Sequence, residues 1–336
     1  MKVYHIIIVS AVLIMASCTQ QKPQLQRQEL IGQAQGTYFR IVYYDTTMTI
    51  SNVEVDSLLD AFNYSASTYQ KNSVISRVNA NEATELDKDF LAIFNRSQEI
   101  SAETDGSFDI TVFPLVKAWG FHFEDRQKLN LAQVDSVLEF VGFKKVRFDG
   151  EKIVKDDPRL MIGFNAIAQG YSVDLLSDYF LSKGIQNFLI DVGGEMIARG
   201  MKPENESWQV GIQKPEETQY MTDKLQDIVS LTNKALATSG NYRKFFVEDG
   251  IKYSHTLDPK TGYPVQHSLL SVTVITDDAC SADAYATAFM VMGFEKAMAF
   301  ADQKQGLEAY FIFSNEKGEF MVEFTDGFKD LIAKGE

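Results

Sequence analysis

The chain has 336 residues, of which 45% are hydrophobic and 23% are charged. This ordinary globular composition excludes a disordered, a collagen-like and a coiled-coil protein. The formal net charge of −14 argues against duplex DNA or RNA as the main partner, because nucleic-acid binding depends on basic patches that neutralise phosphates. The two cysteines exclude a disulfide-rich framework and a cysteine-based zinc site of the usual four-ligand kind.

The N-terminus is typical of a secretory signal. Lys2 precedes an apolar run from Ile6 to Ala16, which is too short for a membrane-spanning helix of about 20 residues. Small residues follow and lead directly into Cys18. This pattern resembles a bacterial lipobox, in which the cysteine becomes the lipidated first residue of the mature protein. An uncleaved anchor helix and a plain secreted protein with a stray cysteine are the alternatives.

Three segments follow from the lipoprotein interpretation. We expect a signal peptide at 1–17, a polar, Gln-rich tether at 18–29 and one folded domain at 30–336. Lipidated Cys18 would hold the domain on the extracytoplasmic, periplasmic face of a bacterial cell membrane. Cys280 would then have no partner for an internal disulfide.

Hydrophobic periodicity predicts the elements of the folded body. The helix-rich stretch 50–140 is a candidate for a separate lobe. Strands and helices do not alternate in strict βαβ order, which favours an α+β fold with mixed, largely antiparallel sheets flanked by helices. In chain order the sequence predicts a strand at 36–44, helices at 52–64, 88–104 and 131–141, a hairpin at 145–155, a helix at 168–183, strands at 187–192, 209–212, 236–238, 244–247 and 271–276, a helix from 282 to about 303, and a hairpin at 310–324.

A candidate metal site lies near the start of the last long helix. Asp283 and Thr287 are four residues apart, so they share one face of the helix. A carboxylate and a hydroxyl are hard oxygen ligands, which suit Mg²⁺ or Ca²⁺ better than zinc. The alternative is structural, since Asp in a first turn favours the helix dipole and Thr commonly bonds to the carbonyl four residues earlier. Spacing alone leaves both interpretations open.

Four further segments combine glycine and small polar residues with neighbouring apolar runs, at 104–111, 163–171, 191–195 and 255–264. Each by itself is ordinary turn chemistry. His255, in the last of them, is either a structural or surface histidine or a group that carries a proton near pH 7. The sequence contains no G-x-S-x-G, HExxH, GxGxxG or Walker motif. A hydrolase triad, a zinc protease and a Rossmann or P-loop nucleotide site therefore lack support.

In this order, the segments together resemble the ApbE-type flavin transferases, which are FAD:protein FMN transferases. The resemblance covers about Gly36 to Met298 and implies an ApbE-like, T-fold-like architecture. The lipoprotein signal also fits the family. The matching segments include Gly36 to Tyr38, Ser67 to Gln70, Asp105 to Asp109, Trp119 to Phe121, Asn165 to Tyr171, Asp191 to Glu195, Thr238 to Tyr242, His255 to Pro264 and Asp283 to Thr287.

The resemblance implies a Mg²⁺-dependent reaction. The pyrophosphate of FAD is cleaved, FMN passes to a Thr or Ser hydroxyl of a target protein as a phosphoester, and AMP leaves. The implied target belongs to a membrane-linked, flavin-dependent redox system. Pyrophosphate cleavage needs a cation, because charge develops on the reacting oxygens. The alternatives are an FAD pyrophosphatase that gives FMN and AMP, and a non-catalytic flavin-binding lipoprotein.

The resemblance also implies roles for individual residues. Asp283 and Thr287 would hold the cation by their side chains, and Ala166 by its backbone carbonyl. Asp283 and His255 are the expected catalytic residues, and His255 would help to remove the acceptor proton. The implied FAD contacts are Gln35, Tyr69 as the aromatic residue at the flavin, Ser107, Phe108, Asp109, Gly163, Gln169, His255 and Leu257.

Two positions depart from the family pattern. Gly163 stands where the family commonly has an Asp that contacts the adenosine part of FAD. Gln169 stands where many members have a Lys, and its amide can form hydrogen bonds but brings no charge. We expect both changes to affect the affinity for FAD more than the fold.

Overall fold

The computed structural model describes residues 25–46, 50–121, 131–215, 224–241, 245–248, 251–254 and 256–333. The predictions for the signal peptide, Cys18 and His255 lie outside these residues. Within the described part of the chain, no helix has the length and apolar character needed to cross a membrane.

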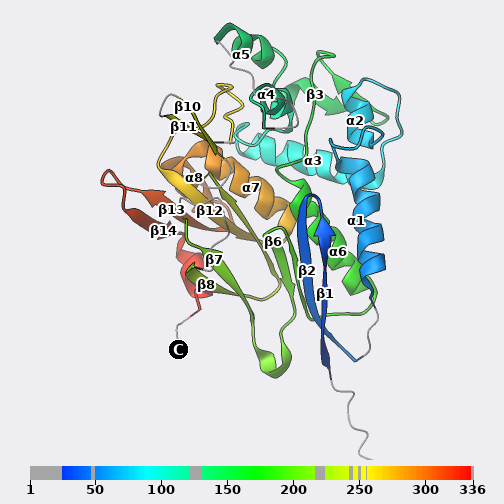
Figure 1. The fold of residues 1–336 in the computed structure, drawn as a ribbon, viewed down its shortest axis with the longest axis vertical. Coiled ribbons are helices and arrows are strands. Elements are labelled where there is room, and N and C mark those ends of the chain that lie inside the picture. Colours follow the sequence, from blue (N-terminus) through cyan, green and yellow to red (C-terminus); the bar gives the residue numbers. More distant parts are fainter. Residues whose placement is uncertain are drawn as a thin grey trace, which may run out of the picture.

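A single eight-stranded sheet forms the centre of the molecule (Figure 1). Each neighbouring pair of strands is antiparallel. The predicted α+β class with largely antiparallel sheet is therefore confirmed. The strands lie in the order β1 (Gln26–Ala34), β2 (Thr37–Asp45), β5 (Phe188–Val192), β6 (Glu195–Arg199), β9 (Lys234–Gly240), β12 (Leu269–Thr276), β13 (Glu308–Ser314) and β14 (Phe320–Phe324).

The two faces of the sheet are covered differently. On one face lie α1 (Asn52–Ala66), α6 (Ala168–Ser182), α7 (Ala279–Met292) and α8 (Phe294–Ala301), and α3 (Lys88–Glu103) packs on α7 (Figure 1). Successive side chains of β12 point to opposite faces of the sheet. Val274 belongs to the core under the helices, whereas Ile275 belongs to a second core with Trp208 and Phe328. That second core lies under the ribbon of β7 (Trp208–Gln213) and β8 (Leu225–Leu231).

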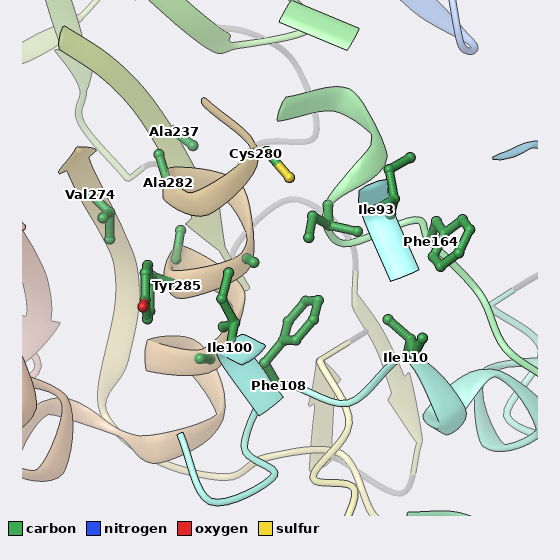
Figure 2. Packing of buried hydrophobic residues seen from close by; sticks show 14 of the residues in the cluster. Ile93, Ile100, Phe108, Ile110, Phe164, Ala237, Val274, Cys280, Ala282 and Tyr285 are labelled. Carbon is green, nitrogen blue, oxygen red and sulfur yellow. The ribbon is translucent and has the colours of Figure 1, made fainter. Parts of the chain in front are cut away.

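Helix α3, in the helix-rich stretch 50–140, shares one core with α7 and the sheet. Ile93 and Ile100 of α3 belong to the same buried cluster as Tyr285 of α7 and Val274 of β12, and Figure 2 shows these side chains together. Burial of shared apolar surface therefore joins α3 to the sheet. This packing contradicts a separate lobe for α3, whereas α4 (Phe113–Ala118) and α5 (Leu131–Leu138) pack in a smaller cluster with Leu257.

The last predicted helix is two helices. Gly293 separates α7 from α8 with φ of +77°, a conformation that only glycine adopts readily. The helix also starts earlier than expected, at Ala279, because Asp278 caps it by accepting a hydrogen bond from the Ser281 N–H.

Strand β1 begins at Gln26, so residues 26–29 of the predicted tether belong to the sheet. The helices α2 (Val74–Asn79) and α4 (Phe113–Ala118) were not predicted. The remaining elements are α5 (Leu131–Leu138), the predicted hairpin of β3 (Val146–Phe148) and β4 (Ile153–Lys155), and the pair β10 (Phe245–Glu248) and β11 (Ile251–Ser254).

Candidate functional site

A cavity of about 800 Å³ opens among α7, the start of α6, the β5–β6 turn and the region around α4. Its size lies within the range of small-molecule and cofactor sites, about 300–1,000 Å³. Gln35 lies in the β1–β2 turn and is not among the lining residues. The predicted site residues that line the cavity are Tyr69, Ser107, Phe108, Asp109, Gly163, Ala166, Gln169, Leu257, Asp283 and Thr287.

Helix α7 brings the predicted cation ligands to the cavity wall. Asp283 and Thr287 both line the cavity, one helical turn apart. Asp283 is 7% exposed, and its Oδ2 accepts a hydrogen bond from the backbone N–H of Gly170 at 3.1 Å. The Thr287 hydroxyl lies 3.5 Å from the Ser239 hydroxyl. Together with the backbone at Ala166, this wall offers carboxylate, hydroxyl and carbonyl oxygens, a donor set that fits Mg²⁺.

Burial raises the pKa of Asp283 to about 7, and the N–H of Gly170 partly opposes this shift. A carboxylate withdrawn from water favours its neutral form unless a positive charge compensates it. A bound cation would supply that charge and keep the carboxylate ionised. The electrostatics of this position therefore fit a cation ligand.

The start of α6 packs directly on α7 and touches the β5–β6 turn. Gly193 in this turn has φ of +66°, and a Cβ there would lie 2.5 Å from Nε2 of Gln169. Asp191 holds the turn, because its Oδ1 accepts the N–H of Gly194 and its Oδ2 accepts the hydroxyl of Tyr38. The Gly193-Gly194 pair therefore forms the turn between β5 and β6, and it also lines the cavity.

Gly163 lies against an aromatic side chain. A Cβ at this position would be 2.7 Å from Cδ2 of Phe113 and 2.9 Å from its Cγ. An aspartate at this position, which the resemblance implies for the family, would therefore collide with the Phe113 ring as it lies in this structure. The chain has an apolar ring beside this part of the cavity in place of a carboxylate.

The carboxylate of Asp109 is engaged within the chain. Its Oδ1 accepts hydrogen bonds from the backbone N–H and the hydroxyl of Thr111 at 2.7 and 2.6 Å, and its Oδ2 accepts the Phe143 N–H at 2.8 Å. Burial raises the pKa of Asp109, and these hydrogen bonds oppose the rise. Asp109 thus stabilises the cavity wall, and both of its carboxylate oxygens already accept hydrogen bonds from within the protein.

Sequence reasoning missed several polar lining residues. Tyr38, Glu195, Gln213 and Ser239 lie on four different strand ends or turns, and no local motif connects them. The usable signal for Tyr38, Glu195 and Ser239 was their place in the segments 36–38, 191–195 and 238–242, which match the family pattern.

Trp119 joins two parts of the cavity wall. Its indole N–H donates to the carbonyl of Gly262 at 2.9 Å, and its ring packs edge-on against Tyr263. This contact ties the end of α4 to the segment that carries Leu257. The wall on this side is therefore fixed by a long-range hydrogen bond.

Comparisons with known proteins show the family of the chain. The sequence profile of the ApbE family matches residues 35–311. The FAD:protein FMN transferase of Vibrio cholerae is 32% identical over 340 residues, covering 98% of this chain and 99% of that protein. The FAD:protein FMN transferase of Escherichia coli K12 is 33% identical over 349 residues, covering 98% and 97%.

Solved structures show the same architecture. The flavin transferase ApbE of Vibrio cholerae superposes with a TM-score of 0.81 at 32% identity, covering 91% of this chain and 99% of that structure. The apo form of the Pseudomonas stutzeri flavinyl transferase ApbE gives a TM-score of 0.83 at 31% identity, covering 93% and 99%.

Proposed function

The chain belongs to the ApbE family, and from this premise we propose that it is a Mg²⁺-dependent FAD:protein FMN transferase. It cleaves the pyrophosphate of FAD, attaches FMN through a phosphoester to a Thr or Ser hydroxyl of a target protein, and releases AMP. The target is a subunit of a membrane-linked redox system.

The observation that carries the proposal is the arrangement on α7. Asp283 and Thr287 lie one turn apart in the lining of a cavity of about 800 Å³, which Ala166 also lines. Bound there, a divalent cation would neutralise charge on the diphosphate oxygens. Tyr69, 52% exposed at the cavity, offers an aromatic face for a flavin ring.

Transfer of FMN is expected to require both a divalent cation and an acceptor hydroxyl. The purified protein is incubated with FAD, Mg²⁺ and a candidate acceptor domain, and the acceptor is weighed by mass spectrometry. We expect an FMN-sized adduct on one Thr or Ser, with one AMP released per adduct. Excess EDTA should abolish the adduct, and added Mg²⁺ should restore it.

Two other outcomes separate the alternatives. Free FMN and AMP without an adduct would identify an FAD pyrophosphatase that uses the same site. FAD that stays bound and intact with Mg²⁺ and acceptor present would identify a flavin-binding protein. An acceptor variant that lacks the hydroxyl is the control, because it cannot take up FMN.

We propose further that lipidated Cys18 anchors the protein at the extracytoplasmic face of the membrane. The small residues before Cys18 support this assignment, and only a short segment separates it from the first strand at Gln26. Metabolic labelling with a radioactive fatty acid should label the wild type and leave the Cys18→Ser variant unlabelled. A wild type that takes up no label, or a Cys18→Ser variant labelled like the wild type, would argue for an anchor other than this cysteine.

A further inference from the structure

Asp174 of α6 binds the first turn of α7. Its Oδ1 accepts the backbone N–H of Ala279 and its Oδ2 accepts that of Cys280, both at 2.8 Å. These are the first two residues of α7, whose N–H groups have no partner within the helix. A side chain from a neighbouring helix therefore completes the cap that Asp278 begins at the Ser281 N–H.

The same face of α6 makes a second contact with α7. Gly170 lies one helical turn before Asp174. Its N–H donates to Oδ2 of Asp283, and a Cβ on Gly170 would lie 2.2 Å from the carbonyl oxygen of Ala279. Gly170 thus sets the close approach of the two helices, and Asp174 sets how far α7 is displaced along its own axis.

The position of α7 along its axis relative to α6, which is its register, matters because the proposed cation ligands come from α7 and from the residue before α6. Asp283 and Thr287 belong to α7, whereas Ala166 immediately precedes α6. A shift of α7 along its axis would move the carboxylate and the hydroxyl away from the Ala166 carbonyl. Cation sites depend on such geometry, and loss of the groups that orient ligands typically weakens metal binding.

We propose that Asp174 is a positioning residue for the cation site, which fixes the register of α7 against α6 and so the placement of Asp283 and Thr287 relative to Ala166. The proposal rests on the proposed function, because it takes this site to be the cation site of the transferase.

Asp174, Asp278 and Cys280 also bring three ligand atoms within 4.8 Å of one another. Capping accounts for this cluster. Both oxygens of Asp174 are engaged by backbone N–H groups, and Oδ1 of Asp278 accepts the N–H and the hydroxyl of Ser281. Burial raises the pKa of the Cys280 thiol, which keeps it protonated and a poor ligand.

The side of α7 that faces α3 is held by a different contact. Nε and Nη2 of Arg96 donate to the hydroxyl of Ser281 at 3.0 and 2.8 Å. This contact holds the helix from the side, and the bonds to Asp174 are those that fix the backbone of its first residues. Substitution of Asp174 is therefore expected to shift α7 without detaching it from α3.

The Asp174→Asn variant tests the proposal. It keeps the shape of the side chain but replaces one acceptor oxygen by an N–H₂ group that faces a backbone donor. We expect the affinity for Mn²⁺ in the presence of FAD, followed by electron paramagnetic resonance, to fall about ten- to a hundredfold. The Mg²⁺ concentration that half-saturates FMN transfer should rise by a similar factor.

Asp87→Asn is the matched control. Asp87 caps α3 by accepting the Phe90 N–H at 2.8 Å, so this substitution makes the same chemical change at the cap of a helix that carries no cation ligand. Because Asn and Asp cap helices about equally well, this control should change the melting temperature little and leave the Mn²⁺ affinity within about twofold. An equal loss of Mn²⁺ affinity in both variants, or none in Asp174→Asn, would overturn the proposal.

A measurement on the wild-type protein covers the case in which Asp174→Asn does not fold. Coupling between two equilibria is reciprocal. If cation binding depends on the position of α7, the bound cation should in turn stabilise the first turn of α7 against opening. Amide hydrogen exchange at 279–282 should slow on addition of Mn²⁺ and FAD, more than exchange at 289–292. Unchanged exchange at 279–282 would contradict the proposal. A wild-type protein that binds no Mn²⁺ would instead refute the cation site of the proposed function.

Discussion

Replacement of Asp283 by asparagine is expected to abolish FMN transfer and to leave a folded protein. The substitution removes the only carboxylate among the three proposed cation ligands, and a neutral amide oxygen holds Mg²⁺ poorly. We expect the transfer rate to fall by more than about a hundredfold, which exceeds the usual cost of losing a group that only orients a ligand. The measurement is the rate of FMN adduct formation at saturating FAD and Mg²⁺.

The fold should survive because the substitution relieves a buried charge. Burial raises the pKa of Asp283 to about 7. Between the pKa of an unfolded Asp, about 3.9, and pH 7, the unfolded chain binds fewer protons than the folded one. The free energy of unfolding of the cation-free wild type therefore falls as the pH rises through this window. In EDTA, Asp283→Asn should show a smaller fall between pH 4 and pH 7 in urea unfolding.

Asp277→Asn is the control for both measurements. The Asp277 side chain is 78% exposed and forms an ion pair with Lys234 at 2.6 Å, close to α7 but outside the cavity lining. It should retain wild-type transfer and the wild-type pH dependence. Full transfer by Asp283→Asn would remove Asp283 from the cation site, and an unchanged pH dependence would contradict the burial of its charge.

Those parts of the fold that follow from local patterns of apolar and turn-forming residues could be predicted from the sequence. The helix at 168–183 was found because its apolar spacing is regular and Gly184 ends it, with φ of +84° in the structure. Strand β1 was missed because it lies at the edge of the sheet, and its pattern of exposed polar residues gives little hydrophobic signal. Strand β6 was missed because it is short and directly follows two glycines.

The site was predictable where its residues share one element. The four-residue spacing of Asp283 and Thr287 indicated a shared face, and both side chains line the cavity. Asp174 could not be found in this way, because the amides that it binds lie 105 and 106 residues further along the chain. Phe113 likewise fills the space beside Gly163 from a distant segment. Such contacts depend on the tertiary packing of elements, which local periodicity does not encode.

Gly170→Ala is expected to destabilise the protein, although helix propensity alone predicts the opposite. Ala is favoured over Gly inside a helix by about 1 kcal/mol. The added Cβ, however, would lie 2.2 Å from the carbonyl oxygen of Ala279 and 2.8 Å from Cβ of Asp283. Because the nearer atom belongs to the backbone of α7, relief requires the two helices to separate. Overpacking of this kind costs about 1–3 kcal/mol, so we expect a net loss of unfolding free energy in urea.

The same separation should weaken the cation site, because it draws Asp283 away from the start of α6. Gly170→Ala is therefore expected to need more Mg²⁺ for half-maximal FMN transfer than the wild type. Ser182→Ala is the matched control, since it introduces the same residue at the exposed end of the same helix, where the Ser182 hydroxyl donates to the Tyr179 carbonyl. It should change the unfolding free energy by no more than about 0.5 kcal/mol. A gain in stability for Gly170→Ala would mean that α6 and α7 lie further apart than this contact requires, and that Gly170 does not help Asp174 to fix the position of α7 against α6.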